Sequence, residues 1–152
     1  MFLRGDFRKG QINDFITMVD VSLFQTLLKP KSVAIVGASA DPKKTGSRAQ
    51  RFLLSHGYRG KVFPVNPNRK EIFGLKCYPN LKSINEQVDH IFVAVDGNKI
   101  IEAIEDAISI KVRCASILSG GFSEAGSEGN DLEKHIFKIA QKGDLRILGP
   151  NS

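Results

Sequence analysis

One stretch of the sequence predicts the fold: S-V-A-I-V-G-A-S-A-D-P-K-K-T-G-S-R, residues 32–48. Its first part, 32–36, is a short run of mostly β-branched apolar residues that stops at Gly37, as expected of a buried strand. Small and polar residues follow, and Gly46 and Ser47 open a stretch with helical spacing. The free backbone N–H groups and the dipole at a helix start favour anions, so the stretch predicts a phosphate-binding turn between a strand and a helix.

The spacing of this turn differs from that of an ordinary dinucleotide site. The fingerprint G-x-G-x-x-G needs three close glycines. This turn has only Gly37 and Gly46, and the longer loop between them contains Lys43 and Lys44. Gly37 allows a tight turn and leaves room for a phosphate beside the backbone. We therefore expect a basic phosphate site that is distinct from an NAD site.

Outward from this turn, apolar runs and helical patterns alternate along the chain. Strands are expected at 32–36, 61–65, 90–95, 114–118 and 145–148. Helices are expected at 21–28, 47–56, 99–110 and 131–142. This alternation predicts an α/β fold, a Rossmann-like doubly wound parallel sheet of about five strands.

The same patterns predict the domain boundaries and some of the packing. One domain is expected at 23–152, preceded by an N-terminal tail or short helix at 1–22. Pro64 cannot donate to a strand ladder, so the second strand is expected at an edge of the sheet. The helix at 21–28 is expected to pack against the sheet. In the helix after the turn, three apolar side chains are expected to face inward: Ala49, Phe52 and Leu53.

The positive charge of the chain, +6 in total, is concentrated around the turn. Residues 29–70 contain ten Lys or Arg but a single acid, Asp41. A polyphosphate ligand, nucleic acid and a merely solvated face are the alternatives. The position of the charge beside a phosphate-type turn favours a small polyphosphate. The few aromatic residues and the lack of a helix-turn-helix or zinc motif disfavour nucleic acid.

Other classes of protein are disfavoured by the sequence. No apolar stretch approaches the roughly 18 residues of a membrane span, and the N-terminus lacks the apolar core of a secretory signal. Cys77 and Cys114 are far apart and in no metal-ligand spacing. We therefore expect buried reduced thiols, no metal site and a cytoplasmic location.

Small, hydrogen-bonding or turn-forming residues follow every predicted strand: G-A-S at 37–39, N-P-N-R at 66–69, D-G at 96–97, S-G-G at 119–121 and G-P-N at 149–151. The carboxyl ends of parallel strands meet at one edge of the sheet, where ligands bind. Loops of any protein are rich in such residues. Their presence at all five strand ends favours a long ligand, with phosphates at the first strand and an arm that crosses the later ones.

The end of the second strand indicates the class of ligand. An NAD site needs Asp or Glu there for the ribose hydroxyls. This chain has Asn66 followed by Arg69 and Lys70. Cations suit a phosphorylated ribose, which leaves the 3′-phosphate of coenzyme A (CoA) and the 2′-phosphate of NADP as alternatives.

Six segments, in order, resemble the N-terminal CoA-binding domain of the NDP-forming acyl-CoA synthetases, which are relatives of the succinyl-CoA synthetase α-subunit. They are V-A-I-V-G-A-S at 33–39 with Gly46, V-F-P-V-N-P-N at 62–68, E-I-F-G-L-K-C-Y-P-N-L at 71–81, V-D-H-I-F-V-A-V at 88–95, S-G-G-F-S-E-A-G at 119–126 and L-G-P-N-S at 148–152. The resemblance covers about residues 23–152. One departure is Asp96-Gly97, where such domains often have Pro-Ala.

The resemblance implies three groups of CoA contacts. The pyrophosphate is expected against Gly37, Ala38, Ser39 and Arg48, in a turn completed by Lys43, Lys44 and Gly46. The adenosine end is expected against Asn66, Pro67 and Asn68, with Arg69 or Lys70. The pantetheine arm is expected to follow Val95, Ser119, Gly120 and Asn151.

The resemblance also implies a function that this chain performs only in part. The family joins a carboxylic acid to CoA at the expense of ATP or GTP, through an acyl phosphate and a phosphorylated histidine that follows the G-P-N turn. We expect no catalytic residue here, because His56, His90 and His135 resemble nothing in that site. The expected partners are CoA or acyl-CoA and downstream ligase and ATP-grasp domains or a subunit, with a homo-oligomer as an option. The alternatives are a stand-alone CoA-binding or CoA-sensing module and an NADP-binding oxidoreductase fragment.

Overall fold

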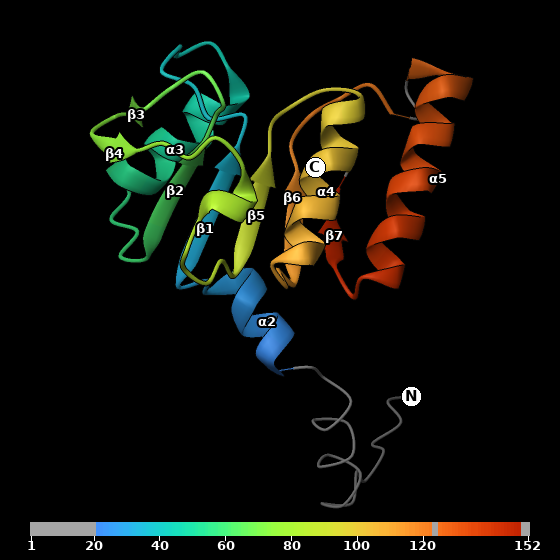
Figure 1. Cartoon of the computed structure of the whole chain (residues 1–152), viewed down its shortest axis with the longest axis horizontal. Helices are drawn as coiled ribbons and strands as arrows, with labels where there is room; N and C mark the ends of the chain where they lie inside the picture. The colour runs from blue at the N-terminus through green and yellow to red at the C-terminus, as the bar shows by residue number, and fades with distance from the viewer. Residues whose placement is uncertain (1–20, 123–124, 150–152) are drawn as a thin grey trace, which may run out of the picture.

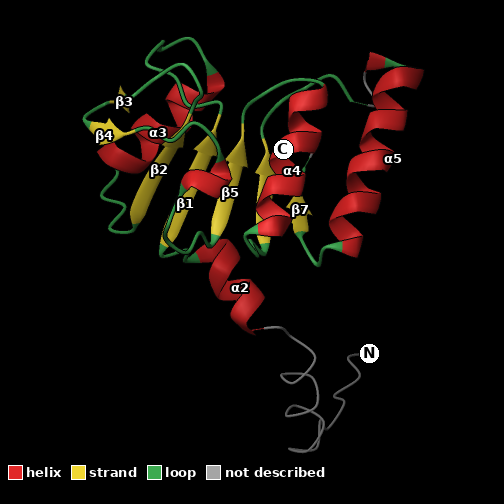
Figure 2. Cartoon of the chain, in the orientation of Figure 1, coloured by secondary structure: helices red, strands yellow, loops and turns green. Residues whose placement is uncertain are grey.

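The computed structural model describes residues 21–122 and 125–149 of the chain. Its centre is a parallel sheet in the order β2-β1-β5-β6-β7 (Figure 1). The strands are β1 (Ser32–Val36), β2 (Lys61–Val65), β5 (His90–Val93), β6 (Cys114–Ile117) and β7 (Arg146–Leu148). The helices are α2 (Val21–Leu28), α3 (Thr45–Ser55), α4 (Asn98–Ser109) and α5 (Ser127–Lys142). The predicted doubly wound α/β sheet is confirmed (Figure 2).

The apolar run of β1 is buried on both faces of the sheet. Ala34 packs into the larger core, which the sheet forms with α4 and α5. Val33 and Ile35 point the other way, into a smaller core that contains Ala49 and Leu53 of α3. Because successive side chains of a strand alternate between faces, a strand covered by helices on both sides is apolar throughout.

The edge position predicted for β2 is confirmed, and a hairpin covers that edge. The hairpin consists of β3 (Glu71–Ile72) and β4 (Leu75–Lys76), which are antiparallel. The carbonyl of Pro64 faces away from β1 and accepts a hydrogen bond from the backbone N–H of Tyr78, at 2.9 Å. Pro64 therefore lies where the ladder needs no donor from it. The short helix η1 (Leu81–Ser83) follows and leads the chain toward β5.

One packing prediction is wrong. Ala49 and Leu53 are partly buried as expected, but Phe52 is 56% exposed and stacks on His56, with 5.1 Å between ring centroids. The buried face of α3 follows Gly46, Gln50 and Leu53 at i, i+4, i+7 spacing. Phe52 lies one residue, about 100°, away from that face.

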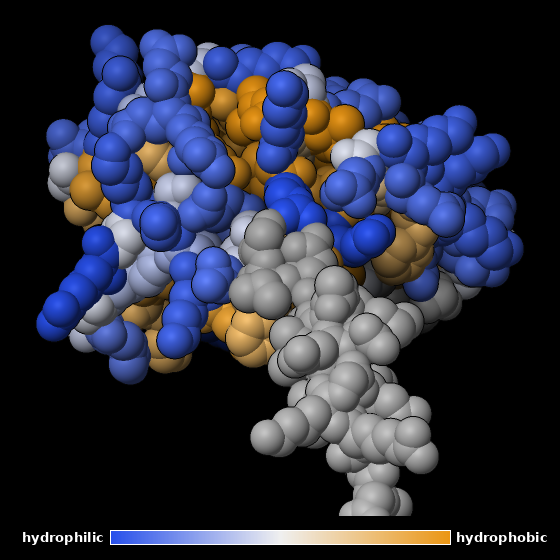
Figure 3. Space-filling model, turned by 90° about the horizontal axis from the view of Figure 1, so that it is seen from below, coloured by the Kyte–Doolittle hydropathy of each residue, from blue (hydrophilic) through white to orange (hydrophobic). Residues whose placement is uncertain are grey.

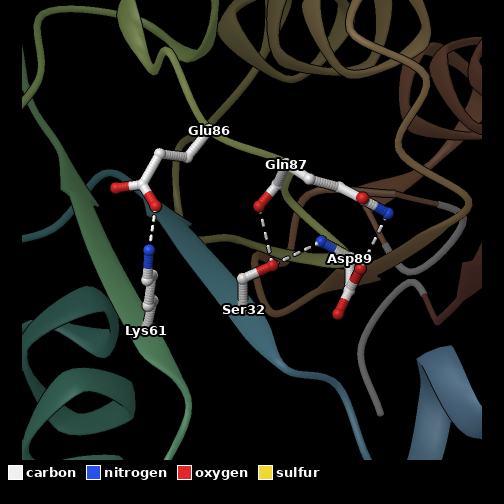
Figure 4. Close-up of polar contacts among 5 residues, drawn as sticks. All are labelled: Ser32, Lys61, Glu86, Gln87 and Asp89. Carbon is white, nitrogen blue, oxygen red and sulfur yellow. Dashed lines mark hydrogen bonds and ion pairs between the residues drawn. The ribbon is translucent and has the colours of Figure 1, made fainter.

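The amino-terminal edge of the sheet is closed by a polar network (Figure 4). The Ser32 hydroxyl donates to the carbonyl of Gln87 at 2.8 Å and accepts from the backbone N–H of Asp89 at 3.0 Å. Lys61 forms an ion pair with Glu86 beside it. These bonds attach the segment before β5 to the first residues of β1 and β2.

A second cavity, of about 730 Å³, lies at this edge between the network and the end of α2. Figure 3 shows this face of the molecule, where hydrophilic side chains surround patches of apolar surface. The helix α2 lies below the strands in Figure 1 and contacts β6, and its Phe24 and Leu28 are largely exposed. Within the described ranges, no helix is long and apolar enough to cross a membrane.

Candidate binding site

A cleft of about 770 Å³ lies at the carboxyl ends of the strands. It is centred on β1 and β5, where the strand order reverses and α/β sheets bind their ligands. Most predicted site residues line it: Gly37, Ala38, Ser39, Lys43, Lys44, Asn66, Pro67, Asn68, Val95, Ser119 and Gly120. The structure thus brings the ends of four strands together around one space.

Two glycines allow the tight packing at the floor of the cleft. Gly37 has a φ of +85°, and its N–H and that of Ala38 both donate to the carbonyl of Val65, at 3.0 and 3.2 Å. A Cβ on Gly37 would collide with the carbonyl oxygen of Ala94. A Cβ on Gly46 would collide with the carbonyl oxygen of Gly37. The end of β5 and the start of α3 therefore reach the turn only because both residues are glycine.

The loop after the turn presents two cations at the start of α3. Asp41 organises this loop: its carboxylate accepts from the N–H of Lys43 at 3.0 Å, and its N–H donates to the Ser39 hydroxyl at 3.1 Å. Lys44 is the N-cap of α3, whose first turn contains no acid. Lys43 and Lys44 both line the cleft. Two ammonium groups beside the N-terminus of an 11-residue helix favour an anion there.

Asn66 joins the turn after β2 to the turn after β1. Its side-chain amide donates to the carbonyl of Ala38 at 2.8 Å, and its amide oxygen accepts from the N–H of Asn68 at 2.9 Å. Both ends of the Asn66 amide are therefore occupied within the protein. Pro67 and Asn68, which follow Asn66, both line the cleft and are exposed.

Some predicted site residues lie outside the lining of the cleft. Arg48, Arg69 and Lys70 are exposed beside it, and Gly46 is buried beneath the turn. Arg48 is two residues after Gly46 on α3, which places it about 200° around the helix from the face that meets the turn. The helical period of α3 could have indicated this. Asn151 lies outside the described residues.

Ser119 holds the far end of the cleft. It is 7% exposed, and its hydroxyl donates to the carbonyl of Val95 at 2.5 Å. The N–H of Leu118 donates to the carbonyl of Val93 at 2.9 Å. These bonds join the carboxyl ends of β5 and β6 and fix the backbone around Val95.

The front wall of the cleft was missed by the sequence analysis. Four residues of α4 form it, at i, i+3, i+4 and i+7 spacing: Lys99, Glu102, Ala103 and Asp106. Asp106 pairs with Lys82 of η1 at 2.7 Å, and this hydrogen bond raises the pKa of Lys82. Asp96, at the end of β5, also lines the cleft. The helical spacing of the charged residues on α4 is the sequence feature from which this wall of the cleft could have been predicted.

None of the three histidines lines the cleft. His56 and His135 are exposed, and His90 is buried near the amino-terminal edge, with Nε2 at 2.8 Å from the Ser116 hydroxyl. Burial lowers the pKa of His90. Within residues 21–122 and 125–149, no three His, Cys, Asp or Glu side chains are grouped as a metal site. Cys77 and Cys114 are both buried thiols.

Comparison with known proteins identifies the family to which most of the chain is similar. A family described as "CoA binding domain" matches residues 31–152. The chain is 40% identical over 126 residues to "Acetate--CoA ligase [ADP-forming] II" of Archaeoglobus fulgidus. That match covers 83% of this chain and 19% of the relative.

Solved structures agree with this match. The first is "Ca. Korarchaeum cryptofilum dinucleotide forming Acetyl-coenzyme A synthetase 1 in complex with phosphate and ADP", with a TM-score of 0.80 and 39% identity. The match covers 84% of this chain and 27% of that one. A "Conserved hypothetical protein" from Pyrococcus furiosus has a TM-score of 0.62 and 31% identity, over 76% of this chain and 90% of that one. The chain thus spans about a fifth to a quarter of the two enzymes but most of the third protein.

Proposed function

The chain belongs to the CoA-binding domain family, and from this premise we propose that it serves as the CoA-binding part of an NDP-forming acid–CoA ligase. The observation that carries the proposal is the 40% identity to one segment of an ADP-forming acetate–CoA ligase. The cleft at the reversal of strand order, with its basic turn, is where that segment would hold CoA.

In this proposal the pyrophosphate of CoA lies against the turn after β1. The N-terminus of α3 points at this turn, and Lys43 and Lys44 supply two positive charges beside it. Gly37, Ala38 and Ser39 offer a backbone surface without bulky side chains. Gly46 supports the turn from beneath rather than by touching the ligand.

The adenosine end lies beyond Asn66 in this proposal. Pro67 and Asn68 line the cleft there. Arg69 and Lys70 are exposed on the same loop, and Arg48 is exposed on α3. Long cationic side chains extend well beyond their backbone, so these three can meet a 3′-phosphate at the mouth of the cleft. The backbone position of the loop depends on the two hydrogen bonds of Asn66.

The pantetheine arm crosses the ends of β5 and β6 and brings its thiol out of this domain. Val95, Ser119 and Gly120 line that path, and Asn151 follows on the sequence. The chemistry, in which a carboxylic acid, CoA and ATP or GTP give acyl-CoA, NDP and phosphate, requires a histidine and a nucleotide site that we assign to other domains or to a subunit. We also expect a cytoplasmic location, consistent with the thiols of Cys77 and Cys114.

The proposal is tested by measuring thermal stabilisation with CoA, 3′-dephospho-CoA, NADP and NAD. A ligand at about 100 times its Kd adds roughly 2.7 kcal/mol to the free energy of unfolding. We expect stabilisation by CoA that weakens without the 3′-phosphate. Stabilisation by NADP alone would contradict the proposal and favour an oxidoreductase fragment. Incubation with ATP, CoA and simple acids should give no acyl-CoA from this chain alone.

A stand-alone CoA-binding module is the second candidate. It is favoured by the similarity to a P. furiosus protein of which this chain covers 90%. The two candidates differ in what binds the CoA-loaded domain. A ligase domain should form a complex with an ATP-grasp partner that completes acyl-CoA synthesis, and a module should not.

A further inference from the structure

Asp96 has an unusual position for an acid in a site that binds phosphates. It lies at the carboxyl end of β5, the central strand of the sheet, and lines the cleft. It is exposed, and in the part of the chain that the structure describes its carboxylate has no hydrogen-bond or ion-pair partner. The loop that follows a strand at the reversal of strand order is where a ligand passes.

The backbone on both sides of Asp96 is fixed. The N–H of Ala94 donates to the carbonyl of Val36 at 2.8 Å, and the Val95 carbonyl accepts from Ser119. The Gly97 carbonyl accepts from the N–H of Ile100 at 3.0 Å, in the first turn of α4. The backbone that carries Asp96 is therefore held at the wall of the cleft.

The acids of the cleft lie on one side of it. Lys43 and Lys44 lie on the loop that enters α3, whereas the three acids of the lining, Asp96, Glu102 and Asp106, lie at the end of β5 and on α4, where Lys99 is the one cation among them. A phosphate is repelled by a carboxylate and attracted by the ammonium groups. An ordered ligand therefore presents its phosphates to the lysines and an uncharged, hydrogen-donating part to Asp96.

We propose that Asp96 is a specificity residue that accepts a hydrogen bond from an amide N–H of the pantetheine arm. This inference rests on the proposed function, because the arm of CoA carries two amide groups and no charge. The bond favours CoA over ligands that would bring a negative charge to this position. It also orients CoA, since the reversed ligand would place its pyrophosphate beside the carboxylate.

The test compares CoA with 3′-phosphoadenosine 5′-diphosphate, which keeps all three phosphates of CoA and lacks the arm. Calorimetric titration of the full chain gives the Kd of each ligand for the wild type, Asp96→Ala and Asp96→Asn. Hydrogen bonds to charged groups are strong enough that Asp96→Ala should weaken CoA binding about tenfold. The same variant should bind the truncated ligand as the wild type does or slightly better. Asp96→Asn keeps an acceptor oxygen and should retain most of the CoA affinity.

Glu105→Gln is the matched control, because Glu105 is an exposed acid on α4 outside the lining of the cleft, so that its replacement removes one negative charge near the site without changing the site itself. It should leave the affinity ratio of the two ligands unchanged. Tighter CoA binding by Asp96→Ala, an equal change for both ligands, or the same effect in Glu105→Gln would overturn the role of Asp96. A wild-type chain that binds neither ligand refutes the proposed function itself, and a wild type that binds CoA while Asp96→Ala is unaffected refutes only this inference.

Discussion

Replacement of Gly46 by Ala tests whether the site depends on how closely α3 approaches the turn. The added methyl group would collide with the carbonyl oxygen of Gly37, and further backbone of Gly37 and Ala38 lies next to it. Since these neighbours are backbone atoms, the strain cannot be relieved by a side-chain rotation. Gly46 has no positive φ, so Ala is disfavoured there by space alone.

The expected cost combines two opposing effects. Overpacking in a close-packed region costs about 1–3 kcal/mol. Ala gains up to about 1 kcal/mol over Gly in a helix interior, and less in the first turn. A net loss of about 2 kcal/mol in the free energy of unfolding lowers the Tm of a domain of this size by roughly 4–8 °C. If the pyrophosphate lies against this turn as we propose, a shifted helix start also loses a hydrogen bond to it, and CoA binding weakens about tenfold.

Gly57→Ala is the comparison variant. Gly57 follows the other end of α3, has a φ of +73° and has open space where a Cβ would lie. Its replacement should cost about 1–2 kcal/mol through left-handed strain and leave CoA affinity unchanged. Calorimetric melting and titration with CoA measure both quantities for each variant. A Gly46→Ala chain with the stability and CoA affinity of the wild type would refute the account of the turn.

Three further outcomes are expected. The double variant Lys43→Ala/Lys44→Ala should bind CoA at least tenfold more weakly than the wild type at low salt. Titrations at rising ionic strength should show this difference in affinity shrinking, because salt screens the charges. Equal affinity of the two proteins at every salt concentration would contradict the phosphate assignment. Burial lowers the pKa of His90, so the folded chain binds a proton on this imidazole less readily than the unfolded chain. The free energy of unfolding should therefore fall as the pH drops below about 6.5. Denaturant unfolding of His90→Asn should show a smaller fall over the same pH range. Ser32→Ala removes the two hydrogen bonds to Gln87 and Asp89. Urea unfolding should show a loss of about 1–3 kcal/mol in the free energy of unfolding, and the CoA affinity should stay unchanged. A weakened CoA affinity would mean that the two edges of the sheet are coupled.

The strands and the region of the site followed from simple patterns. Apolar runs such as 32–36, when they alternate with helices, predict buried parallel strands. Pro64 predicts an edge strand because it has no backbone N–H to donate to a neighbouring strand. The boundaries of α3 and α5 differ from the prediction, beginning at Thr45 and Ser127 instead of 47 and 131. Helix starts depend on loop hydrogen bonds, such as those of Asp41, that the sequence pattern does not display.

The individual site residues were harder to predict, because a motif gives the order of residues but not the direction of their side chains. Arg48 belongs to the motif, yet it lies on the outer part of α3. Asn66 belongs to it as well, yet its amide is occupied by two turns of the protein. The charged face of α4 at Lys99 and Glu102 lies outside every motif and enters the site through tertiary packing.

The hydrogen bonds of Asn66 have a consequence for how tightly two fragments of CoA should bind together compared with each one alone. Because the Asn66 side chain belongs to the turn after β2 and hydrogen-bonds to the turn after β1, a change in the order of one turn is passed to the other. A fragment that binds only the adenosine side then pre-orders the phosphate side, so a second fragment meets a prepared surface. Loss of the Asn66 amide would break this thermodynamic coupling and leave two separate weak subsites, even though neither fragment had lost a direct contact.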